Sequence, residues 1–252
     1  MTRIAVNGAL GQMGAAVLAQ ALDDASLTVV AGIDAAAGAT PANLPYRLLT
    51  SLDDLDEPVD VLIDFSRPAA LPRLLASPAG ALVLGTTGYS DDDKALIAAA
   101  AQQRAIFVAA NMSYGVAVLT ALVRHAEVAL GASYDVEIAE THHRRKVDAP
   151  SGTALMLAQT VAAASADPMT VITDRPARHE ARQQGEIGVV SLRGGTVAGE
   201  HTVSFFGDDE TIELRHVAQS RRGLASGALR ATHWVAGRAP GLYGMDQLVA
   251  DA

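Results

Sequence analysis

One stretch of the chain, residues 140–154, gathers the side chains that proton transfer and anion binding require. Its fifteen positions read Glu-Thr-His-His-Arg-Arg-Lys-Val-Asp-Ala-Pro-Ser-Gly-Thr-Ala. Histidine exchanges a proton near neutral pH, and cations beside the start of a helix attract carboxylates. Charge this dense between two apolar segments exceeds what solubility requires. The pattern predicts a site for a small anionic molecule that must accept a proton.

A helix is expected to follow this cluster, over residues 151–164. Pro150 precedes it and Ser151 is the expected N-cap. The first N–H groups of such a helix, with the Thr153 hydroxyl, form a seat for a carboxylate. The residues expected to hold a dicarboxylate and deliver a proton to it are His142, His143, Lys146, Ser151, Gly152 and Thr153.

The adjacent imidazoles of His142 and His143 also suggest a metal site. Neighbouring side chains in an extended segment point to opposite sides, so we predict that no single ion binds both and that no metal is present. Arg144 and Arg145 fit a solvated face as well as contacts to another subunit. The scattered histidines are expected to be structural or on the surface: His125, His179, His201, His216 and His233.

Composition limits the class of protein. The chain has 252 residues, half of them hydrophobic, and a net charge of −9, which argues against nucleic acid as a partner. It contains no cysteine, which excludes disulfides, thiol catalysis and thiolate metal sites. We see no signal-peptide pattern and no apolar run near the ~20 residues of a membrane span. A cytoplasmic protein without a membrane partner is expected.

The first residues predict a dinucleotide site. A short strand over residues 3–7 leads into a G-x-x-G-x-x-G turn, residues 8–14, and then into a helix to about residue 22. This order places backbone N–H groups and the positive helix end where a pyrophosphate can sit. A second strand, residues 27–33, ends at Asp34, where an acid would receive ribose hydroxyls. The glycines alone also fit an ordinary strand-to-helix turn without a ligand.

Strands and helices continue to alternate through the first half. Further strands are predicted at residues 59–65, 81–84 and 105–109, with helices near 69–75 and 92–103. This alternation predicts an α/β fold with a doubly wound parallel sheet that binds ligands at the carboxyl ends of its strands. Small polar residues follow three of these ends, at residues 64–66, 85–88 and 110–113.

The second half has a different pattern. A long helix is predicted at residues 114–130, a strand at 134–139, and extended segments at 187–193, 196–206 and 211–217. Gly194 and Gly195 separate two of these segments and predict a hairpin. We expect a separate α+β domain over residues 114–220, with a mixed, largely antiparallel sheet available for self-association. A final helix near 224–236 is expected to return to the first domain, 1–113, which residues 221–252 complete.

These residues resemble the 4-hydroxy-tetrahydrodipicolinate reductase (dihydrodipicolinate reductase) family over essentially the whole chain. The family motif Glu-x-His-His-x-x-Lys-x-Asp-x-Pro-Ser-Gly-Thr-Ala matches residues 140–154 at every fixed position, and residues 8–14, 85–88 and 199–202 look like family features. The resemblance implies an N-terminal Rossmann-like domain and a C-terminal domain that mediates a homotetramer. It also implies hydride transfer from NADH or NADPH to a cyclic unsaturated dicarboxylate, with loss of water, in the diaminopimelate route to lysine.

The resemblance also implies residue roles. His142 would donate the proton and Lys146 would be the second catalytic cation. Substrate carboxylates would bind His143, Ser151, Gly152 and Thr153. The dinucleotide would be lined by Gly8, Ala9, Leu10, Gly11, Gln12, Met13, Asp34, Gly85, Thr86, Thr87, Ala109, Ala110, Asn111 and Met112, with Arg221 toward the nicotinamide.

Two positions depart from family members that use NADPH well. Those members often carry a basic residue at the position of Gln12 and another just after the acid at Asp34, where this chain has Ala35. A 2′-phosphate would face the Asp34 carboxylate without a cation at either place. We therefore predict a preference for NADH over NADPH.

Three other functions share parts of this pattern. A different nicotinamide-dependent dehydrogenase would keep the glycine turn but lack the complete charged motif. A dinucleotide sensor would need no proton donor, and a metal hydrolase would depend on a divalent ion.

Overall fold

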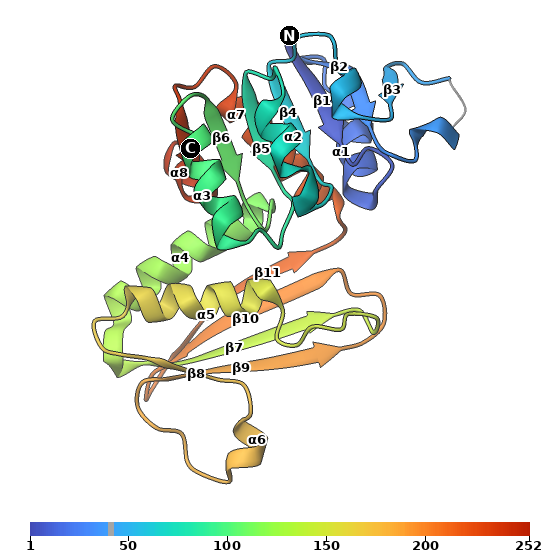
Figure 1. The fold of residues 1–252 in the computed structure, drawn as a ribbon. Coiled ribbons are helices and arrows are strands. Elements are labelled where there is room, and N and C mark those ends of the chain that lie inside the picture. Colours follow the sequence, from blue (N-terminus) through green and yellow to red (C-terminus); the bar gives the residue numbers. More distant parts are fainter. Residues whose placement is uncertain (40–42) are drawn as a thin grey trace. The chain divides into compact units, whose positions relative to one another are not determined.

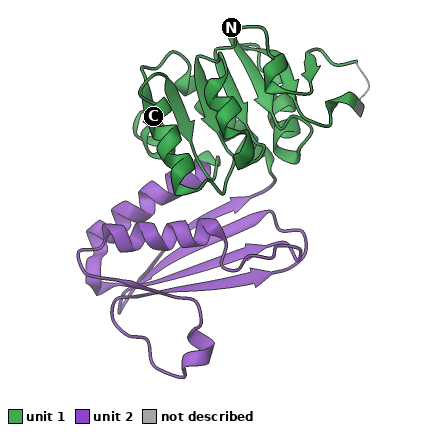
Figure 2. Cartoon of the chain, in the orientation of Figure 1, with its two compact units in different colours: residues 1–114, 221–252 green, residues 115–220 purple. Residues whose placement is uncertain are grey.

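The computed structural model describes residues 1–39 and 43–252 and divides into two compact units (Figures 1 and 2). Unit 1 comprises Met1–Tyr114 and Arg221–Ala252, and unit 2 comprises Gly115–Ser220. Unit 1 is therefore assembled from both ends of the described chain, with unit 2 inserted between its two segments.

Unit 1 is built on a seven-stranded sheet in the order β12–β6–β5–β4–β1–β2–β3, with parallel neighbours throughout. Its strands are β1 (Thr2–Asn7), β2 (Leu27–Ile33), β3 (Arg47–Leu49), β4 (Val61–Asp64), β5 (Ala81–Leu84), β6 (Ala105–Val108) and β12 (Gly241–Tyr243). The central strands β4 and β5 are buried along their whole length, because both faces of the sheet are covered. The predicted doubly wound parallel sheet is confirmed.

Helices cover both faces of this sheet (Figure 1). One face packs against α1 (Gln12–Leu22), α7 (Arg222–Val235) and α8 (Met245–Ala250), and the other against α2 (Leu71–Ala76) and α3 (Asp91–Ala100). Short 3₁₀ turns occupy Ala37–Ala39, Leu52–Asp54, Pro68–Ala70 and, in unit 2, Gly131–Ser133. Helix α7 approaches the chain after β6 so closely that a Cβ on Gly227 would lie 1.7 Å from the Met112 carbonyl oxygen.

Unit 2 contains a five-stranded mixed sheet in the order β11–β10–β7–β9–β8. Its strands are β7 (Asp135–His142), β8 (Thr170–Ile172), β9 (Glu186–Arg193), β10 (Gly199–Phe206) and β11 (Thr211–Ala218). Strand β10 is antiparallel to β7 and β11, whereas β9 is parallel to β7 and β8. The predicted α+β arrangement with a mixed sheet is confirmed.

The hairpin predicted at Gly194 and Gly195 is wrong, because β7 lies between β9 and β10. The turn instead crosses the end of β7. Gly194 N–H donates to the His142 carbonyl over 2.9 Å, and Arg144 N–H donates to the Gly195 carbonyl over 3.3 Å. The two glycines therefore carry the chain across β7 to its other side.

One face of the unit 2 sheet packs against α4 (Tyr114–Leu130) and α5 (Gly152–Ala164) (Figure 1), and a single turn, α6 (Arg175–Arg178), precedes β9. Side chains alternate between the faces of a strand. Val189 and Phe205 lie in the core beneath the helices, whereas Val190, Leu192 and Phe206 are 54%, 56% and 43% exposed. The face away from the helices is therefore partly apolar.

The expectation that no apolar stretch approaches a membrane span is wrong for one segment. Residues Tyr114–Ser133 are long and apolar enough, by length and composition, to cross a bilayer. This alone is weak evidence, since the core helix of a soluble protein meets the same criterion. Leu119 and Val123 of this segment are buried in the core of unit 2.

Candidate active site

The end of β7 places the predicted proton donor in a buried acidic contact. Glu140 and His142 are two positions apart and share one face of the strand, with Glu140 fully buried and His142 9% exposed. Nδ1 of His142 lies 2.5 Å from Oε2 of Glu140. His143 follows the strand and is half-buried. The two imidazoles are therefore in different environments.

Glu140 is surrounded by donors. The Arg193 guanidinium at the end of β9 donates to both carboxylate oxygens, over 2.9 and 2.8 Å, and Ser151 N–H donates to Oε1 over 3.1 Å. Burial alone would raise the pKa of Glu140, but hydrogen bonds from Arg193 and His142 outweigh it and lower the pKa from 4.5 to about 2. Glu140 is therefore a carboxylate at neutral pH.

A second imidazole, His201 of β10, lies against the first. The rings of His142 and His201 are 5.2 Å apart at their centroids, edge to face, and His201 Nε2 is 3.2 Å from Ser151 Oγ. Burial, and then the nearby His142, lower the pKa of His201 from 6.5 to about 4, so this ring is neutral at pH 7. No pattern in the sequence separated His201 from the other scattered histidines, although it lies in the family-like stretch 199–202.

Lys146 follows in a turn in which its N–H donates to the His143 carbonyl over 3.1 Å. Its ammonium donates to both carboxylate oxygens of Asp148, over 2.9 and 2.8 Å, which lowers the pKa of Asp148. Helix α5 then begins at Gly152, and Ser151 Oγ accepts the N–H of Ala154 over 3.2 Å. The predicted N-cap is confirmed. The cation and the positive end of α5 are thus held in one short segment.

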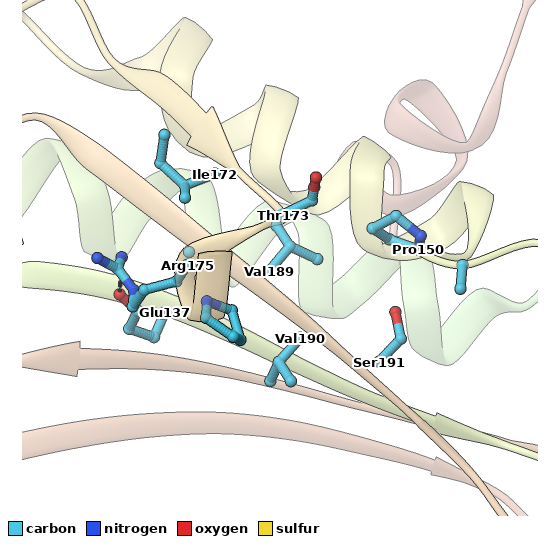
Figure 3. A pocket seen from close by; sticks show the side chains of 11 residues that line it. Glu137, Pro150, Ile172, Thr173, Arg175, Val189, Val190 and Ser191 are labelled. Atoms are coloured by element: carbon cyan, nitrogen blue, oxygen red, sulfur yellow. Dashed lines mark hydrogen bonds and ion pairs between the residues drawn. The ribbon is translucent and has the colours of Figure 1, made fainter. Parts of the chain in front are cut away.

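A pocket of about 600 Å³ adjoins this cluster on the β9 side (Figure 3). Glu137 and Arg175 form an ion pair of 2.8 Å at one end, and Ser191, which pairs with Glu140 across β7 and β9, lies at the other. The predicted catalytic residues lie outside its lining. The pocket is therefore a separate feature of unit 2 beside the cluster.

In unit 1 the glycine turn is tight and leads directly into a helix. Gly8 has a φ of +79°, and a Cβ on Gly14 would lie 2.1 Å from the Gly8 carbonyl oxygen. Helix α1 begins at Gln12, directly after the turn. Asp34 accepts the N–H of Leu10 over 3.0 Å and that of Ala36 over 3.0 Å. The structure therefore joins the predicted acid to the predicted turn.

A pocket of about 650 Å³ opens at this turn. Its lining includes Gly8 and Asp34, together with two cations that sequence reasoning missed, Arg67 and Arg73. The Arg73 guanidinium is 3.6 Å from the Asp53 carboxylate. These arginines follow β4 rather than β2, so their distance from Asp34 in the sequence concealed them.

The strand ends predicted to approach a cofactor meet through one buried carboxylate. Asp64, at the end of β4, accepts from Asn7 of β1 over 2.7 Å, from Ser66 over 2.6 Å and from Thr86, just after β5, over 2.6 Å. A Cβ on Gly85 would lie 2.2 Å from the ring of Phe65. The carboxyl ends of β1, β4 and β5 are therefore tied together at one edge of the sheet.

The other predicted cofactor residues have varied surroundings. Thr86, Thr87 and Ala110 line a further pocket of about 520 Å³. Met112 is 2% exposed and packs in the core, so its side chain is closed to a ligand. Ala9 is buried. The other predicted cofactor residues are partly or fully accessible to solvent, namely Leu10, Gly11, Gln12, Met13, Ala109, Asn111 and Arg221.

Comparisons with known proteins cover nearly the whole chain. The family model described as "Dihydrodipicolinate reductase, N-terminus" matches residues 2–112, and that described as "Dihydrodipicolinate reductase, C-terminus" matches residues 115–249. A 4-hydroxy-tetrahydrodipicolinate reductase of Caldanaerobacter subterraneus is 39% identical over 252 residues, 99% of this chain and 98% of the relative. One from Exiguobacterium sp. is 48% identical over 205 residues, 80% of this chain and 81% of the relative.

A solved structure shows the same fold. The dipicolinate-bound dihydrodipicolinate reductase of Paenisporosarcina sp. superposes with a TM-score of 0.81 at 24% identity, covering 98% of this chain and 99% of that one. The resemblance noted in residues 140–154 is confirmed by these matches. With both halves matched by family models and a relative aligned along almost its full length, the chain belongs to the dihydrodipicolinate reductase family.

Proposed function

We propose that this chain reduces 4-hydroxy-tetrahydrodipicolinate, by way of dihydrodipicolinate, to tetrahydrodipicolinate with NADH or NADPH, in the diaminopimelate route to lysine. The observation that carries the proposal is the cluster at the end of β7. There the buried Glu140 holds His142 by its Nδ1, and Lys146 and the start of α5 follow within the same motif. The names of the relatives supply the substrate.

The proposed reaction consists of a dehydration and a reduction. The hydroxylated ring loses water to give a conjugated imine, and the ring then takes up one hydride and one proton. A reduced nicotinamide, when bound, supplies the hydride. The electron-rich ring that results must receive its proton from a protein group, for which a histidine is suited.

The residues of the charged motif suit the remaining tasks. The Glu140 carboxylate can only accept, so one proton of His142 stays on Nδ1. A second proton, taken from solvent onto Nε2, is the one that the resulting imidazolium passes to the substrate. Lys146 has three N–H donors and directs two to Asp148, which leaves one for a substrate carboxylate. The first turn of α5 attracts an anion. We propose that His143, Gly152 and Thr153 bind the ring carboxylates there, with Ser151 fixing the helix start.

The glycine turn of unit 1 fits a dinucleotide. Any side chain at Gly14 would collide with the Gly8 carbonyl, so the absence of a Cβ lets α1 pack closely against the turn, as in dinucleotide-binding turns. The residues that we propose to line the cofactor are Gly8, Ala9, Leu10, Gly11, Gln12, Met13, Asp34, Gly85, Thr86, Thr87, Ala109, Ala110, Asn111, Met112 and Arg221. Met112 would contribute through its backbone, because its side chain is buried.

A preference for NADH is part of the proposal. Asp34 is fixed against the turn by Leu10 and Ala36, and its carboxylate would repel a 2′-phosphate. Arg67 and Arg73 in the same pocket are the cations that could offset this repulsion. The kcat/KM for NADH divided by that for NADPH measures whether the repulsion by Asp34 outweighs the attraction by the two arginines. A ratio below one contradicts the preference for NADH.

We further propose a homotetramer assembled through the open face of the unit 2 sheet. Val190, Leu192 and Phe206 expose apolar surface there, as an interface between copies requires. Light scattering coupled to size exclusion measures the mass. If this face is the interface, the Leu192→Lys variant should have a smaller mass than the wild-type tetramer. An unchanged mass would contradict that assignment.

The activity is tested by mixing the protein with NADH and the freshly formed product of the upstream synthase, and following the loss of nicotinamide absorbance. His142→Gln and Lys146→Ala should each lower turnover by about 10²-fold or more while NADH binding is retained. Matched controls are His125→Gln, an exposed imidazole, and Arg145→Ala, an exposed cation next to Lys146. If wild type does not consume NADH, or if the controls lose as much turnover as the site variants, the proposal fails.

A further inference from the structure

Hydrogen bonds from three residues converge on the carboxylate of Glu140. It is fully buried and accepts from His142, from both ends of the Arg193 guanidinium and from Ser151 N–H. Arg193 lies directly opposite His142 in the register of β7 and β9. The three side chains therefore share one face of two neighbouring strands, with the carboxylate bound to both other groups.

This arrangement fixes which nitrogen of His142 is available. A carboxylate bonded by the Arg193 fork has no proton to donate, so the proton of the 2.5 Å contact belongs to Nδ1 of His142. The other nitrogen, Nε2, is not engaged by Glu140. A Cβ on Gly199 would lie 3.0 Å from Nε2, so the absence of a side chain at this position leaves space beside that nitrogen.

Arg193 also reaches the segment that carries Lys146. Its guanidinium donates to the Asp148 carbonyl over 2.6 Å, while the Asp148 carboxylate holds the Lys146 ammonium. The remaining bond to Glu140 comes from Ser151, the N-cap of α5. One carboxylate–guanidinium pair therefore links the imidazole, the ammonium and the proposed carboxylate seat.

We propose that Glu140 and Arg193 are positioning residues of this site, which hold His142 with Nδ1 protonated and Nε2 facing the substrate, and which set its distance from Lys146. The inference rests on the proposed function for the identity of the reaction. Neither residue is assigned contact with the substrate. Their effect is on the tautomer and the position of the groups that do make contact.

The test compares Glu140→Gln, Arg193→Met and Arg193→Lys with a control, Arg175→Met. Arg175 pairs with Glu137, also on β7, so its loss breaks an Arg–Glu contact in the same sheet away from His142. Nitrogen-15 NMR of labelled histidine reads the tautomer of His142 directly, without substrate or cofactor. The glutamine variant should convert the single Nδ1–H form into a mixture, because an amide can donate as well as accept.

In the same variants kcat should fall more than KM rises. We expect kcat to fall by about 10-fold to 100-fold, which is part of the factor of about 10²–10⁴ that a positioned acid contributes to the rate. Arg193→Lys should recover part of the kcat that Arg193→Met loses. The pH–rate profile of Glu140→Gln should shift, while that of Arg175→Met should keep its shape.

An unchanged His142 tautomer in Glu140→Gln overturns the inference even if turnover falls, since a merely structural role would give that result. Equal effects of Arg193→Met and Arg175→Met on kcat and on the pH profile also overturn it. If wild type is inactive with the dicarboxylate but the NMR result holds, the proposed function fails and the positioning of His142 stands.

Discussion

Replacing His201 with glutamine should remove most of the acid sensitivity that unit 2 shows between pH 7.5 and pH 5. His201 is 4% exposed, and burial and the nearby His142 lower its pKa from 6.5 to about 4. Because the folded-state pKa is the lower one, the unfolded chain takes up the proton first as the pH falls. The stability is therefore fully present above pH 6.5 and is lost as the pH falls toward 4.

The magnitude follows from these two pKa values. At pH 5 the imidazole is almost fully protonated in the unfolded chain and mostly neutral in the folded protein. This difference lowers the free energy of unfolding by about 2 kcal/mol relative to pH 7.5. Glu140 contributes little in this window, because its pKa falls from 4.5 to about 2 and its share of stability is lost at lower pH. Burial also lowers the pKa of His216, which adds a loss that the variant retains.

Urea unfolding followed by far-ultraviolet circular dichroism at the two pH values measures this effect. The pH-dependent loss in free energy of unfolding should be smaller by about 2 kcal/mol in His201→Gln than in wild type. Trp234, the only tryptophan, lies in unit 1, so its fluorescence follows the other unit in the same samples. His125→Gln controls for the loss of one exposed imidazole. Equal losses in wild type and His201→Gln would refute the reasoning.

Two further predictions concern glycines in unit 1. Gly227→Ala would place a methyl group 1.7 Å from the Met112 carbonyl oxygen and should destabilise unit 1 by about 2 kcal/mol or more in thermal unfolding, whereas Gly223→Ala in the same helix, with open space around it, should not. Gly85→Ala would displace the ring of Phe65 at the edge of the Asp64 network, and we expect NADH binding to weaken by about 10-fold in a fluorescence titration. An unchanged dissociation constant would contradict the second prediction.

Features set by residues close in sequence were predictable. The N-cap at Ser151 and the strand, glycine turn and helix over residues 2–22 depend on positions a few residues apart, and the structure has them as expected. The charged motif was recognised, but the strand before it was predicted to end at residue 139, whereas β7 continues to His142 and places Glu140 and His142 on one strand face. The roles assigned to these residues remain predictions.

Contacts between distant segments were not predictable. Arg193 is 53 positions from Glu140, and nothing in the spacing indicates that β7 separates β9 from β10. Strands β3, β8 and β12 have three residues each, too few for an alternating pattern to be recognised. The cations Arg67 and Arg73 were missed for a related reason, since their place in the same pocket as Asp34 depends on the order of strands in the sheet.

The insertion of unit 2 has a consequence for synthesis on the ribosome. Residues 1–114 emerge first, but the apolar sheet face that α7 covers stays bare until residues 221–252 have been translated. The inserted residues 115–220 form a continuous unit and need no later segment to close their core. A nascent chain arrested before residue 221 would therefore expose this apolar sheet face to chaperones and proteases, although residues 1–220 of the 252 had already been made.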